Sequence, residues 1–586
     1  MSTGLDTADH LCPQNLARAQ RLLTAKALGE LSHERLLTPC STVGDGWEVR
    51  TGASTWRFDA RRHALEHWTV DPDSIERTRD DGGAGDIDVL ELVAELHEEL
   101  GIPQSLVGTY LEELAATLAA RCWTLAHHHE RARDLLEADL AGVEAAMHEG
   151  HPAFLATNGR IGYGIDDHRA YAPETGSEVA LVWLAIRREL AALSLGEGLD
   201  ERTLYEGELD AEERASFTAV LRGHALDPGD YVMMPVHPWQ WTNKIAVTFA
   251  ADVARRDVVP LGTGRDRYRA QQSVRTFLNV TTPGRHYVKT ALSVQNMGFL
   301  RGLSPHYMRA TPAINDWVHA LVEADEELRA CRFSVLRERA AVGYVGGVFQ
   351  QLQGPSPYAK MLSALWRETP HLAAGERAAT MASLLHRDHD GNGLTSATIR
   401  ASGLDPADWV RRYLDAYLRP VAHCLWAHDL AFMPHGENVI VVFVDHVPVR
   451  VVLKDVGEEV VVMSDRPLPA GVERIRADVP PRLRSLSVLT DVVDGFLRFL
   501  AAALDEDGVL AEDAFWDEAA ACLRALQEAH PEHAEAHAAH DLFAPEFDHS
   551  CLNRLQLRNT LEMVDLTDQA SSLVFAGTLA NPLHGR

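Results

Sequence analysis

One stretch of the chain constrains its fold more than any other: FMPHGENVIVVFVDHVPVRVVLKDVGE, at residues 432–458. Two apolar runs flank a short turn, which predicts an antiparallel β-hairpin. Polar residues stand at its open end, namely His435, Glu437 and Asn438 before the first run and Lys454 and Asp455 at the end of the second. A core hairpin does not need these groups, so they either bind something or form a turn cap and an exposed charged pair.

The bulk composition excludes several classes of protein. The 586 residues are 46% hydrophobic, which predicts a packed globular protein of several domains. A net charge of −30 argues against binding to nucleic acids or anionic membranes. The seven cysteines are dispersed without a CxxC pair, so we expect a reducing, cytoplasmic setting. The N-terminal segment lacks the pattern of a signal peptide.

The order of the predicted elements indicates an α+β fold in about three parts. A helix is predicted over 13–38 and a small sheet over 47–70, followed by a Gly/Asp-rich loop at 79–88. Helices continue to about residue 148, and strands alternate with helices from 150 to 345. Helices are predicted again from about residue 360, interrupted by the hairpin, and continue to the C-terminus.

An island of positive charge breaks the acidic pattern at residues 261–310. It holds eight Lys or Arg residues and a single acid, Asp266. Such a run is usually a solvated face paired with acidic neighbours. Here, however, Ser273 and Arg275 are predicted to share one face of a strand, and Lys289 to follow Tyr287 on one face of another. Cations on neighbouring strands suit a polyphosphate such as a nucleotide.

A bound nucleotide triphosphate also needs Mg²⁺, which prefers carboxylates and other oxygen ligands. Antiparallel pairing of the hairpin would bring Asn438 and Asp455 to the same side. An Asn and a later Asp bind Mg²⁺ in protein kinases in a similar way. The sequence therefore predicts Asn438 and Asp455 as metal ligands.

Eight segments together resemble the NRPS-independent siderophore synthetases, the aerobactin-synthetase family. They occur in the family's order over residues 150–460: EGHPAFLATNGRIGYG (149–164), YAPE (171–174), MPVHPWQW (234–241), SVRT (273–276), VKTALSV (288–294), FLRGLSP (299–305), HGEN (435–438) and LKDV (453–456). Each segment alone is weak, but eight in order are specific.

The resemblance implies a fold and a reaction. The expected fold is a cupped hand with a thumb at 1–148, fingers at 149–358 and a palm with a helical C-terminal part at 359–586. ATP would bind between fingers and palm, and the protein would form a homodimer. The expected enzyme is a ligase that converts a carboxylate to an acyl-adenylate, releases pyrophosphate, and transfers the acyl group to an amine or hydroxylamine.

The resemblance also implies roles for individual residues. The ATP contacts would come from Ser273, Arg275, Thr276, Lys289, His435, Glu437, Asn438 and Asp455. Arg301 would lie where the α-phosphate meets the carboxylate, and His435 would stabilise charge that develops there, with Lys289 also in the catalytic set. Preorganised donors at such a point contribute about 3–4 kcal/mol each. Mg²⁺ would be bound by Asn438 and Asp455.

The segment at 149–164 points to the substrate. Citrate-using members typically carry G-H-P-x-H-P-x-x-K-x-R-x-G, and this chain has Phe154, Leu155 and Asn158 in place of the second His, the second Pro and the Lys. The loss of two polar groups disfavours a tricarboxylate. The segment most resembles the desferrioxamine-type synthetases, which join N-hydroxy-N-succinyl diamines and close the ring. Substrate contacts would come from His151, Asn158, Arg160 and Arg301.

Other readings stay open at this level. A citrate- or 2-oxoglutarate-using synthetase is one alternative, and a small-molecule phosphotransferase is another, because HGEN followed by Asp resembles antibiotic kinases. A non-catalytic siderophore-binding protein is the third. The histidines at 533, 537 and 540 are predicted to lie on a surface helix. The family's C-terminal region is compared with ferric-siderophore reductases, but Cys522 and Cys551 are too few for an iron–sulfur centre.

Overall fold

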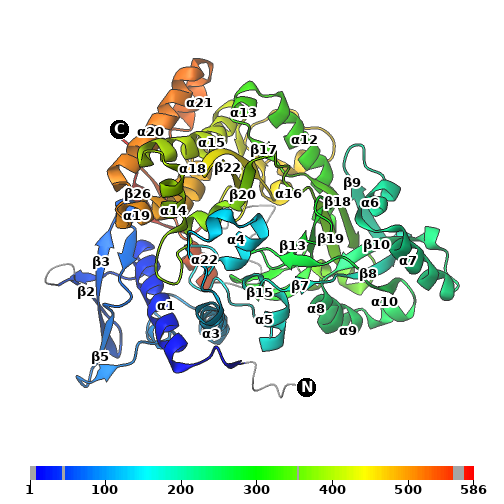
Figure 1. The fold of residues 1–586 in the computed structure, drawn as a ribbon, viewed down its shortest axis with the longest axis horizontal. Coiled ribbons are helices and arrows are strands. Elements are labelled where there is room, and N and C mark those ends of the chain that lie inside the picture. The colour runs from blue at the N-terminus through cyan, green and yellow to red at the C-terminus, as the bar shows by residue number, and fades with distance from the viewer. Residues whose placement is uncertain (1–7, 43–45, 353–355, 559–572) are drawn as a thin grey trace.

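The computed structural model describes residues 8–42, 46–352, 356–558 and 573–586. It is an α+β protein, as predicted, with an N-terminal, a middle and a C-terminal region (Figure 1). Among the described residues, no helix is both long and apolar enough to cross a membrane.

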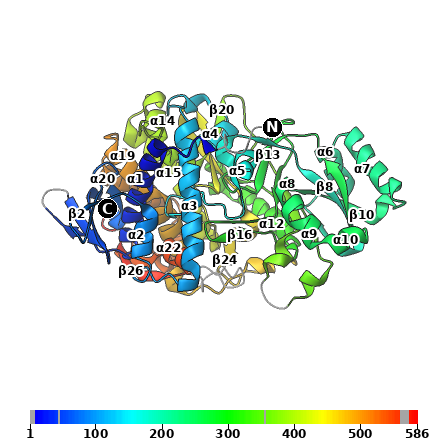
Figure 2. The same ribbon diagram turned by 90° about the horizontal axis from the view of Figure 1, so that it is seen from below.

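The N-terminal region packs two long helices on a small antiparallel sheet. Helices α1 (Pro13–His33) and α3 (Gln104–His127) run side by side (Figures 1 and 2). The alternation at 47–70 is confirmed by the strands β2 (Gly46–Arg50), β3 (Ser54–Arg62) and β4 (Trp68–Val70). The predicted loop at 79–88 is partly wrong, because β5 (Glu76–Arg79) pairs with β6 (Ala84–Gly85) across a turn in which Gly82 has φ 82°.

The middle region is built on a seven-stranded sheet. Its order is β7-β12-β13-β14-β19-β18-β9. The strands are β7 (Glu178–Val179), β12 (Tyr268–Ala270), β13 (Thr276–Asn279), β14 (Tyr287–Thr290), β19 (Ser363–Arg367), β18 (Glu338–Tyr344) and β9 (Ala191–Leu195). A second sheet, β10 (Tyr231–Val236), β8 (Val182–Arg187) and β11 (Val258–Thr263), packs nearby through one shared hydrophobic core.

Strand β14 has the predicted alternation. Val288 lies in the core of the middle region, whereas Tyr287 packs on the opposite face with Ile440 of the hairpin. Lys289 therefore shares the face that looks toward the hairpin. The prediction that Ser273 and Arg275 share a strand face is wrong: β13 begins at Thr276, and Val274, with φ 66°, turns the chain just before it.

The third region holds the hairpin. β22 (Val439–Val444) and β23 (Val447–Leu453) pair antiparallel, and the intervening Asp445 and His446 have φ of 49° and 63°, the left-handed conformation that two-residue hairpin turns require. Short strands flank the hairpin: β17 (Ser334–Val335) on one side and β20 (Glu376–Thr380) on the other. The helix α15 (Pro406–His428) covers the sheet and packs on α20 (Glu512–Ala529).

Two parts of the helical prediction are wrong. β19 and β20 lie where helices were expected from residue 360. The run Ser363–Arg367 is buried at all five positions, and so short a buried run has no periodicity that would distinguish a strand from a helix. The C-terminal part also ends in a strand pair, β25 (Glu546–Ser550) with β26 (Phe575–Ala580). These two strands are far apart in sequence, so no local hairpin pattern predicts their pairing.

Three large hydrophobic cores correspond broadly to thumb, fingers and palm. The helix α12 (Thr311–Ala324), however, contributes Ile314, Val318 and Val322 to the core of the palm region. The palm core thus draws on residues before 359. The predicted domain boundaries themselves remain a prediction.

The middle sheet depends on Trp366, which is fully buried in β19. Trp366→Ala is expected to lower the free energy of unfolding by about 3–5 kcal/mol, because it leaves a cavity that the surrounding strands cannot fill. Denaturant unfolding followed by circular dichroism measures this. As a control, Val247→Ala changes a residue that is 70% exposed and should stay within about 0.5 kcal/mol of wild type. Equal stability of the two variants would contradict the assignment of Trp366 to the core.

Candidate active site

The open end of the hairpin meets the middle sheet through a buried ion pair. Lys289 Nζ of β14 lies 2.7 Å from Asp455 Oδ1 and 3.1 Å from Glu458 Oε2. Asp455 lies two residues after the end of β23 with φ 61°, and helix α16 (Val456–Glu459) begins after it. Arg367, at the end of β19, adds a second cation 3.1 Å from the same Asp455 oxygen. The basic island and the hairpin therefore converge, as the sequence predicted.

The charged forms of Lys289 and Asp455 are strongly favoured. Burial would raise the pKa of Asp455, but Lys289 and Arg367 hold that pKa well below its ordinary value. Burial likewise opposes the charged form of Lys289, yet the two carboxylates raise its pKa. The alternative of an exposed Lys454–Asp455 pair is wrong, because the Lys454 side chain is only 7% exposed and faces Glu144 at 3.9 Å.

A surplus of carboxylates collects beside this pair. Asn438 donates from Nδ2 to Glu459, and its backbone oxygen accepts from Lys454 N, which fixes Asn438 at the hairpin's open end. Burial, together with the charges of Asp455 and Glu458, raises the pKa of Glu459 to about 8. A carboxylate with so high a pKa lacks a sufficient counter-charge. Carboxylate and amide groups gathered with spare negative charge fit a hard divalent cation such as Mg²⁺.

His435 and Glu437 form a second pair on the same side. His435 Nδ1 lies 2.8 Å from Glu437 Oε2. Burial would lower the pKa of His435, but the hydrogen bond and charge of Glu437 outweigh it and raise that pKa to about 9. The ring of His151 stands 5.7 Å from that of His435, and burial lowers the pKa of His151 to about 4. A protonated and a neutral imidazole thus lie side by side.

Two arginines of the basic island approach from the other side. Arg301, at the end of β16 (Phe299–Arg301), donates from Nη2 to the backbone and side-chain oxygens of Asn296, both at 3.0 Å. Burial, and the nearby charge of Arg275, lower the pKa of Arg301 to about 10. Arg275 donates to the backbone oxygen of Gly302. Like charges held close in a buried place favour an anionic ligand.

Several buried polar atoms here have no hydrogen-bond partner among the described residues. They are Ser273 Oγ, Thr276 Oγ1, Arg301 Nε, Glu437 Oε1 and Arg367 Nε. Such orphaned groups are rare in native proteins, and clusters of them mark sites that bind a ligand. Their position on both sides of the Lys289–Asp455 pair makes this the candidate active site.

The outer arginines of the island pair with acidic neighbours, as is usual for a run of charge. Arg265 pairs with Glu212 at 2.8 Å, Arg269 with Glu178 at 3.4 Å and Arg285 with Asp266 at 2.6 Å. They neutralise neighbouring acids, the first two pairs at exposed positions and the third largely buried. Only part of the charge run therefore reaches the site.

The predicted substrate residues are partly engaged within the protein. Arg160 is 4% exposed and makes a two-fold contact with Glu174, Nη1 to Oε1 at 2.6 Å and Nη2 to Oε2 at 2.9 Å. Asn158 donates from Nδ2 to the backbone oxygen of His148 at 3.4 Å. These contacts hold the polypeptide chain in place around the site.

Sequence reasoning missed Arg367, Glu458, Glu459 and Glu113. Glu458 and Glu459 lie just after the LKDV segment, so the sequence alone already places them near Asp455. Arg367 gives no local signal. Glu113 of α3 reaches across to accept hydrogen bonds from Gly298 N at 2.8 Å and Gln295 Nε2 at 3.3 Å, and burial raises its pKa to about 7.

The His435–Glu437 pair makes a prediction that needs no substrate. In Glu437→Gln the pKa of His435 should fall clearly below its wild-type value of about 9, because the hydrogen bond and charge that most oppose the effect of burial are removed while only Glu459 and Asp491 remain. The imidazolium, present below about pH 9 in wild type, would be lost at a lower pH. Histidine NMR titration, with the signal assigned by its loss in His435→Gln, measures this.

A matched control exists elsewhere in the chain. Burial opposes protonation of His63 too, but hydrogen bonds to Glu506 and Glu512 raise its pKa to about 9. Glu506→Gln should lower the pKa of His63 and leave that of His435 unchanged. An unchanged His435 pKa in Glu437→Gln would contradict the pairing.

Comparison with known proteins identifies the family. The model of the IucA / IucC family matches residues 139–386, and that of the ferric iron reductase FhuF-like transporter matches residues 407–565. All seven cysteines are free, and Cys522 and Cys551 are both buried.

The putrebactin synthase of Shewanella sp. (strain MR-4) is 42% identical over 98% of this chain and 92% of its own. The structure of aerobactin synthetase IucC from Klebsiella pneumoniae matches with a TM-score of 0.85 and 28% identity, covering 97% of this chain and 98% of that one. ATP-bound aerobactin synthetase IucA from the same organism has the same fold, with a TM-score of 0.74 and 15% identity over 97% of this chain and 100% of that one. The chain belongs to the IucA / IucC family of siderophore synthetases.

Proposed function

We propose that the protein is an ATP-dependent ligase that activates a carboxylate as its adenylate and condenses it with an amine. The observation that carries this proposal is the convergence of Lys289, Asp455 and the orphaned polar atoms Ser273 Oγ, Thr276 Oγ1 and Arg301 Nε in one buried place. A neutral ligand would leave the like charges of Arg275 and Arg301 uncompensated, whereas a triphosphate compensates them. The ATP-bound relative supports the same choice of nucleotide.

The chain's own groups suit the two chemical steps. Arg275, Lys289, Ser273 and Thr276 bind the phosphates as donors. Arg301 and the protonated His435 stabilise the negative charge that builds up as the substrate carboxylate attacks the α-phosphorus and pyrophosphate leaves. The amine nitrogen then attacks the acyl carbon, the C–O bond to AMP breaks, and a proton leaves the nitrogen. His151, neutral beside His435, is placed to accept that proton.

Asn438, Asp455 and Glu459 would hold Mg²⁺. The raised pKa of Glu459 is the observation that favours a cation there. When bound, the ion neutralises phosphate charge and aids pyrophosphate departure. Because Lys289 pairs with Asp455, we expect Lys289 to turn toward phosphate when Mg²⁺ binds Asp455.

The substrate that the site favours is the succinyl end of an N-hydroxy-N-succinyl diamine, and the product a desferrioxamine-like hydroxamate. Phe154 and Leu155, which replace two residues of the citrate pattern, are buried at 6% and 2% exposure and offer no donor. Leu300, which precedes Arg301 in β16, lines a pocket of about 430 Å³ together with Ile161, Trp239, Asn243, Lys244, Ser293 and Gln295 among others. This mixed apolar and polar lining suits an alkyl chain that carries an amide or hydroxamate.

A substrate panel tests this proposal. Incubation with ATP and Mg²⁺ and the succinyl hydroxamates of four- and five-carbon diamines should give dimers, longer oligomers and macrocycles by mass spectrometry, with AMP and pyrophosphate released. Activity with citrate or 2-oxoglutarate alone would overturn the substrate, and release of ADP would overturn the adenylate and support a phosphotransferase.

Lys289 provides the sharpest single substitution. Lys289→Ala removes a phosphate donor and leaves Asp455 and Glu458 with one cation fewer, so kcat should fall about 10²–10³-fold. Pyrophosphate release measures this at saturating ATP. Arg202→Ala, on the exposed surface of the same region with a side chain 70% accessible, should retain full activity. Normal turnover by folded Lys289→Ala would contradict the assigned role.

A further inference from the structure

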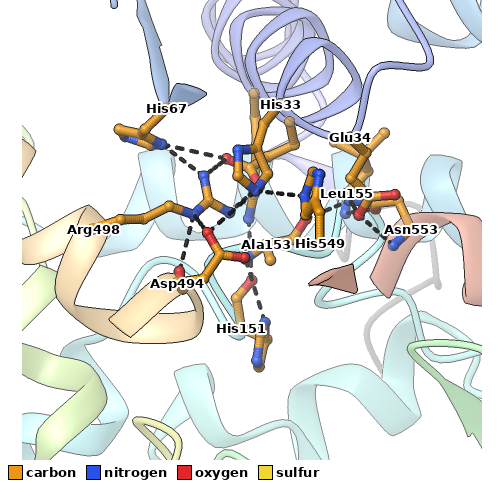
Figure 3. A network of polar contacts seen from close by, with 12 residues as sticks. His33, Glu34, His67, His151, Ala153, Leu155, Asp494, Arg498, His549 and Asn553 are labelled. Carbon is orange, nitrogen blue, oxygen red and sulfur yellow. Dashed lines mark hydrogen bonds and ion pairs between the residues drawn. The ribbon is translucent and has the colours of Figure 1, made fainter. Parts of the chain in front are cut away.

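A second polar cluster lies away from the candidate active site, where three segments distant in sequence meet (Figure 3). His33 comes from the last turn of α1, Asp494 from the π-helical segment η12 (Leu489–Leu497), and His549 from β25. Their exposed fractions are 2%, 6% and 1%. Nothing in the proposed reaction uses this cluster.

The donor atoms of the three side chains converge on one point. His33 Nε2 lies 3.2 Å from His549 Nε2 and 3.3 Å from Asp494 Oδ1, and all three donor atoms lie within 4.8 Å of one another. Ligand atoms bound to tetrahedral zinc at about 2.0–2.1 Å lie about 3.3 Å apart. The spacing therefore fits ligands of a single ion as well as it fits hydrogen bonds.

The polar contacts of the two histidine rings also favour a shared ligand. The Nδ1 atoms of His33 and His549 make no hydrogen bond to any described residue. Both rings thus direct their only polar contacts to the shared point.

The balance of charge around the cluster also favours a bound cation. Arg498 is the fixed cation beside it, 2.9 Å from Glu30 Oε2 and 3.1 Å from Asp494 Oδ1. Arg498 Nη1 also donates to His67 Nδ1 at 2.7 Å, which requires His67 to be unprotonated at that atom. Two buried carboxylates therefore share one guanidinium. Buried charge is normally paired or bound to a metal.

A third carboxylate is nearby. Glu34 accepts hydrogen bonds from the backbone and side chain of Asn553, at 2.7 and 3.0 Å, and burial raises its pKa.

We propose that His33, Asp494 and His549 bind one divalent transition-metal ion, for which zinc fits the nitrogen and oxygen donors and their spacing, with water completing the coordination. The ion has a structural role. It ties the end of α1 to the palm region and to β25, and so supports the neighbouring contact of Glu34 with Asn553. Asn553 in turn holds Ala153 O at 2.8 Å and Leu155 N at 3.2 Å, next to His151 (Figure 3).

The experiment uses the full chain with any affinity tag removed. Metal analysis after dialysis should find about one zinc per chain, as for a buried structural site. Stripping with a chelator should lower Tm, and adding Zn²⁺ should restore it. Cobalt loaded into the stripped protein should give the visible absorption of a four-coordinate nitrogen and oxygen site, and X-ray absorption should show histidine ligation.

Matched variants locate the site. His549→Gln and Asp494→Asn should lose the ion and its effect on Tm. His428→Gln changes a similar cluster, in which His428 Nε2 lies 2.9 Å from Asp325 Oδ2 and is 20% exposed, and it should retain the ion. Where a variant does not fold, the cobalt spectrum of the folded wild type still decides.

Two results would overturn the proposal. The first is a stripped wild type that takes up neither Zn²⁺ nor Co²⁺ at stoichiometric concentration, which leaves the cluster as a set of hydrogen bonds only. The second is loss of the ion in His428→Gln but not in His549→Gln, which places the metal at the other cluster.

Discussion

The buried contact between Lys289 and Asp455 is the interaction on which the rest of the site depends. It joins two sheets that also meet where Tyr287 packs on Ile440: β14 belongs to the core of the middle region, and the hairpin belongs to the palm core. Removing one partner of such a pair costs about 3–5 kcal/mol, since the other is left as an unpaired buried charge. Arg367 also pairs with Asp455. Lys289 can therefore exchange Asp455 for phosphate while the carboxylate keeps a cation beside it.

The site separates charge across this contact. Acids gather on the hairpin side, where the pKa of Glu459 is raised, and cations gather on the other, where the pKa of Arg301 is lowered. Each side is short of its counter-charge. A nucleotide and its divalent ion would supply both at once, the phosphates to the arginines and the metal to the carboxylates. The strain of holding like charges together in a buried place is thus relieved by ligand, which is how a fold stores binding energy for a charged substrate.

The hairpin and its polar ends were predictable because their signals are local. Period-two alternation fixed the faces of β14, and the sequence showed the hairpin, but the register that sets Asn438 opposite Lys454 also depends on a β-bulge between Val442 and Phe443. Arg367 was not predictable, since its strand is buried on both faces and reads as an apolar run of no definite period. Arg160 shows the other limit: a charge in a matching motif was expected to face the substrate, yet Glu174 of a second motif neutralises it. Pairing between motifs depends on tertiary structure, which spacing along one segment does not show.

The segment 150–162 connects all three regions, which explains why its sequence is informative about substrate. Glu113 of the thumb packs so closely on Gly159 that a Cβ there would lie 2.1 Å from its backbone oxygen, so glycine is required. Lys26 of α1 donates to His151 O at 3.3 Å, and Asn553 holds Ala153 and Leu155. With its backbone held by thumb and C-terminal residues, the segment has few positions left to vary. His151 keeps its place beside His435, so the side chains at 154, 155 and 158 remain as the places where donor groups are gained or lost. Under the proposed function, a change of substrate class within this fold would therefore come from substitutions at positions 154, 155 and 158.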